Sequence, residues 1–173
     1  MMLLALSPAI SLGLPTTLAA RQSSSEGIGE AQSNWFQDTS MVSQFLSTAS
    51  SLSGQDLVNA ASAALANKDN ELVHKGVLDA AFVSMLDSDD LAPIQTANAT
   101  LVTQGTFQFV VDGLTDLATN GAGYSPGQVV TAVEGINAIR CTQVLPAIDV
   151  YLQNAALLSL QSIPNAAARP NNC

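Results

Sequence analysis

Apolar residues recur at spacings of three and four along most of the chain, and no stretch alternates apolar and polar residues with a period of two. This periodicity is typical of amphipathic helices. The first predicted helix covers residues 38–52 and ends at Ser53. Its apolar face carries Met41, Phe45 and Leu52. The pattern therefore predicts an all-α protein.

A second helical region covers residues 56–86. Its apolar face turns by roughly 140° between the two halves of the region, at about 100° per residue. The region either breaks at the weak helix formers of segment 67–70 or continues as one helix that changes its packing partner there. Both interpretations keep the region helical and differ only in the number of helices.

Helix-start signals divide the rest of the chain. Asp87 is a predicted N-cap for a helix that carries Pro93 in its first turn and runs to about Thr119. Ser125 and Gln128 have the spacing of a capping box, which predicts the start of another helix at this point.

A final helix is predicted over residues 142–161, with Pro146 in the first turn, where its missing N–H is harmless. The connections between the predicted helices are short. We therefore expect a single-domain bundle of about five helices, which occupies residues 38–173 and has its C-terminal tail held by a disulfide.

The N-terminus has the features of an export signal. Residues 1–20 contain no charged side chain, and their apolar run is interrupted by Pro8 and Pro15, so it is too short to span a membrane. Residues 1–20 are a predicted signal peptide, and residues 21–37 are a predicted flexible lead-in. No second apolar stretch of spanning length follows. The expected location is extracellular, with no transmembrane segment.

Export gives the two cysteines a meaning. Cys141 and Cys173 are the only cysteines, and Cys173 ends a tail that is a poor helix former. In an oxidising compartment we expect them to form a disulfide, which in the chain-entropy model stabilises the fold by roughly 3–4 kcal/mol. The alternative is a pair of free thiols. Asn98 begins an Asn-x-Thr sequon and is a candidate glycosylation site, or an unused sequon inside a helix.

Charge excludes several function classes. The chain has 173 residues with 5 Lys+Arg against 14 Asp+Glu, a formal net charge of −9. So few cations cannot form a nucleic-acid interface. Two Cys and one His cannot supply a zinc cluster. The negative charge is interpreted as a means of keeping an Ala-rich bundle soluble.

Segment 123–127 matches the Gly-x-Ser-x-Gly pattern of the hydrolase nucleophile elbow. The oxyanion hole of that motif uses the N–H of the residue after Ser125, and Pro126 has none. The motif also needs a His after the Ser, whereas the single His74 precedes it. The segment is therefore interpreted as a helix cap.

Glu71 and His74 have the Glu-x-x-His spacing of di-iron bundles, but such a site needs that motif twice, and the chain has no second His. We interpret the segment as a solvated face with helix-stabilising pairs between Glu71 and Lys75 and between Lys75 and Asp79. His74 is expected to be a partly buried structural residue.

Other acidic residues also lack a site pattern. Counting from Asp87, an EF-hand-type loop would need Gly and Glu where the chain has Ala92 and Asn98. Asp112 and Asp116 are expected on a solvated face. We find no catalytic constellation, metal site or cofactor motif, and the protein is not expected to be an enzyme.

Three segments resemble small secreted proteins of filamentous fungi: 71–79, 105–114 and 136–149, within the stretch 35–156. That group implies no particular activity or site residues. In size, export and helical architecture the chain is also similar to the fungal hydrophobic-surface-binding and cell-wall mannoprotein family. This resemblance implies a helical protein, and some members of that family hold fatty acids between their helices.

The hydrophobic fraction of 47% is large for so few charged residues. Apolar side chains of this number either fill the core or leave an internal apolar cavity. We therefore expect a secreted, non-enzymatic protein that binds an apolar small molecule, a surface or a cell-wall component. The alternative is an effector or regulator that binds a host or cell-wall protein through its acidic surface.

Overall fold

The computed structural model describes residues 26–160 and 166–173. The predicted signal peptide over residues 1–20 lies outside the described residues. The described chain is helical and contains no strand, which confirms the all-α prediction. None of the helices in this part of the chain has an apolar stretch of membrane-spanning length.

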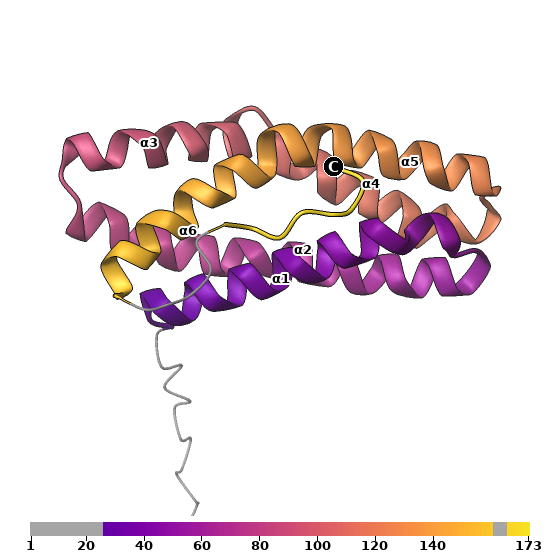
Figure 1. The fold of residues 1–173 in the computed structure, drawn as a ribbon, viewed down its shortest axis with the longest axis horizontal. Helices are drawn as coiled ribbons and strands as arrows, with labels where there is room; N and C mark the ends of the chain where they lie inside the picture. The colour runs from indigo at the N-terminus through magenta and orange to yellow at the C-terminus, as the bar shows by residue number, and fades with distance from the viewer. Residues whose placement is uncertain (1–25, 161–165) are drawn as a thin grey trace, which may run out of the picture.

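Four helical rods make up the described bundle, fewer than the predicted number of about five helices. Their helices are α1 (Ile28–Thr48), α2 (Gly54–Met85), α3 (Ser88–Asn98), α4 (Thr106–Asn120), α5 (Pro126–Ile139) and α6 (Leu145–Ser159). The first two helices are rods by themselves, α3 and α4 follow each other in the third rod with an interruption between them, and α5 continues into α6 (Figure 1). Successive rods run in opposite directions, and each packs on its neighbours.

The predicted break before the last helix is wrong. The π-helical segment Arg140–Val144 joins α5 directly to α6. In a regular α-helix the ring of Pro146 would clash with the carbonyl of Thr142. The wider π-helical turn lies immediately before Pro146, so the rod continues where the sequence predicted an interruption.

The predicted helix from Asp87 to about Thr119 is instead interrupted. The π-helical segment Ala99–Thr103 is followed by Gly105, whose φ of 70° lies in the left-handed region. Glycine adopts this conformation without the steric cost of a Cβ. Asp87 is confirmed as the N-cap, because its carboxylate accepts bonds from the N–H groups of Asp89 and Asp90.

The start of the first helix differs from the prediction, and the structure decides whether the second region is one helix or two. Residues 28–37, predicted as part of a flexible lead-in, belong to α1, and Trp35 within them is fully buried. The region predicted over residues 56–86 is one unbroken helix, which packs on α1 and on α4. The capping box of Ser125 and Gln128 is confirmed at the start of α5.

The disulfide between Cys141 and Cys173 is present, with the two Cα atoms 5.6 Å apart. The tail before Cys173 runs along α1 (Figure 1). Ser43 donates a hydrogen bond to the carbonyl of Ala168, and the side-chain amide of Asn137 in α5 donates one to the side-chain oxygen of Asn172. The tail therefore joins the first rod to the last, and the disulfide fixes its end.

Helices α4 and α5 are in close contact at Gly113. A Cβ at this position would lie 2.5 Å from Cγ1 of the buried Ile136. Gly135 lies on the same helix as Ile136, and a Cβ there would meet nothing within 4 Å. The absence of a side chain at Gly113 is therefore a packing requirement.

We predict that Gly113→Ala lowers the free energy of unfolding by about 1–3 kcal/mol, because Ile136 must move. Gly135→Ala is the control and should raise it by up to about 1 kcal/mol through helix propensity. Urea denaturation of both variants measures the difference. Equal stability of the two variants would contradict the close packing of α4 on α5.

Candidate functional site

Helix α2 carries a row of charged side chains on its inner face. Lys68, Glu71 and Lys75 are buried at spacings of three and four, in line with the core residues Leu78 and Phe82. The prediction that Glu71 and Lys75 lie on a solvated face is therefore wrong. The spacing was compatible with either face, and burial is decided by the rods that pack around α2.

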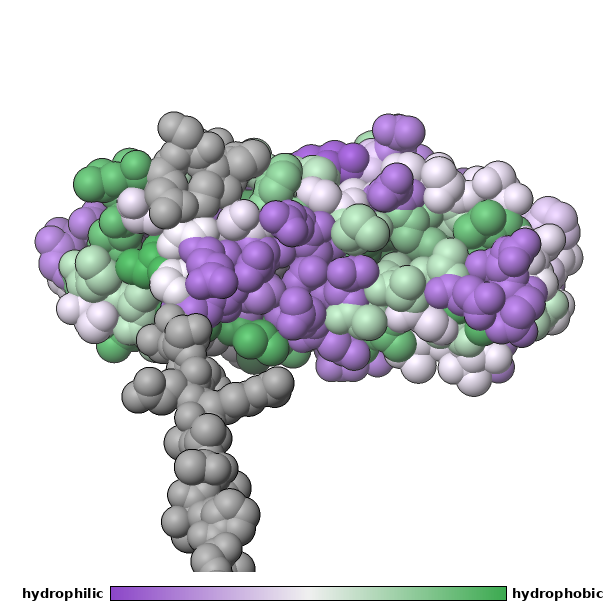
Figure 2. All heavy atoms as spheres, turned by 90° about the horizontal axis from the view of Figure 1, so that it is seen from below, coloured by the Kyte–Doolittle hydropathy of each residue, from purple (hydrophilic) through white to green (hydrophobic). Residues whose placement is uncertain are grey.

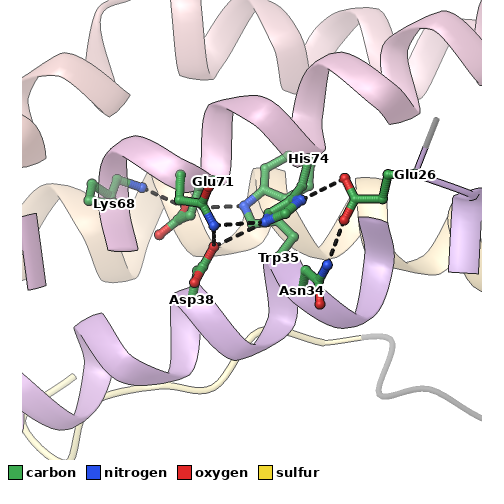
Figure 3. Close-up of polar contacts among 8 residues, drawn as sticks. Glu26, Asn34, Trp35, Asp38, Lys68, Glu71 and His74 are labelled. Carbon is green, nitrogen blue, oxygen red and sulfur yellow. Dashed lines mark hydrogen bonds and ion pairs between the residues drawn. The ribbon is translucent and has the colours of Figure 1, made fainter. Parts of the chain in front are cut away.

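Glu71 is the centre of the buried cluster, shown in Figure 3. Its Oε2 accepts a hydrogen bond of 2.9 Å from Nζ of Lys68 and one of 3.0 Å from Nε1 of Trp35. The Lys68 ammonium also lies 3.6 Å from the centre of the Phe107 ring. One carboxylate thus links α1 to α2, and its cationic partner contacts α4.

The last rod contributes another buried cation to the surroundings of Glu71. Arg140 is fully buried and donates hydrogen bonds to the carbonyl of Thr39 and to the hydroxyl of Ser43. Desolvation lowers the pKa of Arg140 to about 10, although the Glu71 carboxylate opposes this shift. Within the described residues, Oε1 of Glu71 and Nε of Arg140 have no protein hydrogen-bond partner, so the cluster carries a desolvation cost.

His74 connects α2 to the beginning of α1. Its Nδ1 lies 2.9 Å from Glu26, and its Nε2 lies 3.2 Å from Asp38 and 3.0 Å from Asn70 (Figure 3). Burial raises the pKa of Asp38, and its hydrogen bond from Asn70 acts in the opposite direction. His74 is buried and serves as a polar link between helices, with acidic groups on both ring nitrogens.

Asp79 is the centre of another polar group, near the C-terminal end of α2. Asp79 accepts a hydrogen bond of 2.6 Å from Lys75, as the sequence predicted, and one of 2.7 Å from the hydroxyl of Tyr151. Burial and this bond raise the pKa of Tyr151, so its hydroxyl keeps its proton. Lys75 also donates to the side-chain oxygen of Asn98, the candidate glycosylation site, which is only half-exposed within α3.

A groove lies beside this polar group, between α2, α3 and α6. Its apolar wall is made by Phe82, Val83, Leu91 and Ile94, and its polar floor by Asp79 and Tyr151. The volume is about 180 Å³. We call this feature the α2–α3–α6 groove. It is the place where an apolar surface and convergent polar groups meet.

A larger depression, of about 480 Å³, lies over the turn between α4 and α5 and includes Ser125 of the Gly-x-Ser-x-Gly segment. The Ser125 hydroxyl donates to the side chain of Gln128. Asp116, predicted on a solvated face, accepts a hydrogen bond from the hydroxyl of Tyr124, and this bond lowers the pKa of the Asp116 carboxyl. Asp112 is exposed and bonds to Gln108. The bonds of Ser125 and Tyr124 stabilise the turn between α4 and α5.

Charges are sorted between the interior and the surface. Four of the chain's five Lys and Arg residues are described, and three of them, Lys68, Lys75 and Arg140, are buried. The fourth, Arg169, is paired with Asp149, which raises the pKa of its guanidinium. The surface formed by the described residues is therefore acidic, with no unpaired cation.

The core of the described residues contains large buried side chains, two of them charged. Trp35, Tyr151, Phe82, Lys68 and Arg140 are among the largest fully buried side chains. The rings of Trp35 and Tyr151 pack with their centres 5.1 Å apart. Among the described residues, no group of three or more His, Cys, Asp and Glu side chains has an arrangement that could hold a metal ion.

Comparisons with models of protein families, with curated proteins and with solved structures find no match for this chain. The resemblance to fungal secreted proteins therefore stays a prediction.

Buried Lys68 gives the bundle a pH dependence that can be measured. Desolvation lowers the pKa of Lys68 to about 8, against its ordinary value of 10.5. Between pH 8 and pH 10 the unfolded chain holds a proton that the native state has released. The free energy of unfolding should therefore rise with pH, by at most about 1.4 kcal/mol per pH unit.

Lys68→Met should remove this rise between pH 8 and pH 10, whatever its effect on absolute stability. Lys75→Met changes another buried lysine of α2 and is the control, in which the rise should persist. Urea denaturation at several pH values measures the slope. An unchanged slope in Lys68→Met would contradict the assignment.

Proposed function

We propose that the protein is exported, is not an enzyme, and binds an apolar ligand or surface at the end of the bundle where α2 meets α3. The disulfide supports export, because such bonds persist in oxidising compartments. The observation that carries the binding proposal is the apolar surface of this end.

Large apolar side chains are exposed where α2 and α6 end. Val83 is 75% and Met85 56% exposed near the end of α2, and Leu157 is 73% and Leu160 91% exposed near the end of α6. Figure 1 shows that these two helix ends lie at the same end of the bundle. We call these four residues the apolar end.

The surroundings of the apolar end distinguish it from scattered apolar residues. Figure 2 shows hydrophobic side chains at this end, hydrophilic ones over the middle of the same face, and further hydrophobic ones toward the opposite end. The apolar wall of the α2–α3–α6 groove begins with Val83, so the exposed side chains are continuous with a recess. An apolar patch next to a recess is a common feature of binding surfaces.

Leu160 adds a conformational argument. It is the one non-glycine residue of the described chain with a positive φ, at 54°. A leucine in the left-handed region is strained, and solvent exposure of its side chain gives no compensating burial. Burial of Leu160 against an apolar ligand would recover part of this cost.

The test replaces the apolar end by serine in the variant Val83→Ser, Met85→Ser, Leu157→Ser, Leu160→Ser. The control replaces four exposed apolar residues elsewhere, in Met41→Ser, Val102→Ser, Phe109→Ser, Val130→Ser. A fluorescence titration with the neutral apolar dye Nile red should show that the first variant binds about tenfold more weakly than the wild type, whereas the control binds normally.

Circular dichroism of both variants is the control that checks whether they keep the helical fold. Equal binding by the two variants would contradict the location, and an absence of binding by the wild type would contradict the function.

The acidic surface favours a second candidate function, as an effector or regulator that binds a basic partner protein. No unpaired cation on the described surface opposes such a partner. Salt separates the two functions, because charge-mediated binding weakens as salt increases and apolar binding does not.

A further inference from the structure

The α2–α3–α6 groove has a polar floor whose free capacity is for accepting hydrogen bonds. Asp79 receives one bond from Tyr151 and one from Lys75, and its side chain remains 40% exposed. A carboxylate has about four acceptor positions, so Asp79 can accept further bonds from a ligand. The cationic donor nearby, Lys75, is buried and already bonds to Asp79 and Asn98, so the donors that line the groove are the neutral amides of Gln95 and Asn98.

Further carboxylates lie close to the groove along the chain. Asp87, Asp89 and Asp90 begin α3, are exposed, and precede the groove residue Leu91 directly. No described Lys or Arg lines the groove, and the cation nearby, Lys75, is buried and paired with Asp79. The field at the groove therefore attracts a cationic group and repels a carboxylate.

We propose that the α2–α3–α6 groove binds a cationic amphiphile, with its alkyl chain on the apolar wall and its protonated amine on Asp79. The ammonium group would donate N–H bonds to the Asp79 carboxylate, and such charge-assisted bonds are the stronger kind. This proposal rests on the proposed function, because it assigns a ligand class to the same end of the bundle.

The chemistry of the groove selects against the other common amphiphiles. A fatty acid would place a carboxylate beside Asp79 and the acidic start of α3. A fatty alcohol could donate one hydrogen bond to Asp79 but would gain nothing from the field. The order of affinity is therefore amine, then alcohol, then carboxylate, at equal chain length.

Isothermal titration calorimetry of the wild-type protein with dodecylamine, dodecanol and dodecanoate, at neutral pH and below their aggregation concentrations, tests this order. Dodecylamine should bind about tenfold or more tightly than dodecanoate, and the difference should decrease as salt is added. Equal affinities for the three compounds would overturn the cationic preference and leave the proposed function intact. Failure of all three to bind would overturn both.

Variants locate the amine. Asp79→Asn should reduce the preference for dodecylamine over dodecanol, while Asp112→Asn, which removes an exposed carboxylate of α4, should leave it unchanged. Asp79 also pairs with Lys75, so its loss could unfold the protein. The double variant Asp89→Asn, Asp90→Asn leaves that pair intact and should also reduce the preference. An unchanged preference in this double variant, or an equal reduction in Asp112→Asn, would overturn the proposal.

Discussion

The ion pair between Lys68 and Glu71 is the interaction on which the rest of the bundle depends. Both side chains are fully inside, where an uncompensated charge costs several kcal/mol. Compensation requires Trp35 from α1 and the ring of Phe107 from α4, and Arg140 brings a further cation from the last rod. Each of the four rods must therefore be in place before these charges are accommodated. A purely apolar seam between Ala-rich helices would tolerate sliding far more easily.

Placing the cations inside also determines the character of the surface. The chain has few Lys and Arg, and the described ones are buried or paired, whereas most carboxylates remain outside. The exterior thus combines negative charge with exposed apolar side chains, four of which form the apolar end. Such a surface is suited to partners that are apolar, cationic or both, and it disfavours nucleic acids and anionic membranes. The buried polar groups of the interior bond to one another, so the proposed binding is placed on the exterior.

The all-α fold, the helix caps at Asp87 and Ser125 and the disulfide follow from local sequence signals, because periodicity and capping chemistry act over a few residues. The π-helical segment before Pro146 was not predicted, because a proline at this position is compatible both with the start of a new helix and with a rod that continues through a wider turn. The sequence prediction placed the buried charges of Glu71 and Lys75 on a solvated face, because charged side chains are usually exposed to solvent. A signal was available: Lys68, Glu71 and Lys75 continue the stripe of Leu78 and Phe82 on the helical wheel.

The organising role of the buried pair is tested most directly by a double-mutant cycle with Lys68→Met and Glu71→Gln, measured as the free energy of unfolding in urea with the disulfide intact. If the pair organises the bundle, the free energy of unfolding falls by about 3–5 kcal/mol in each single variant. Lys68→Met leaves the buried Glu71 carboxylate without its cation, and Glu71→Gln leaves the buried Lys68 ammonium without its carboxylate. The double variant then loses at least about 1 kcal/mol less than the sum of the two. Losses that add within about 0.5 kcal/mol would contradict the dependence of the bundle on this pair.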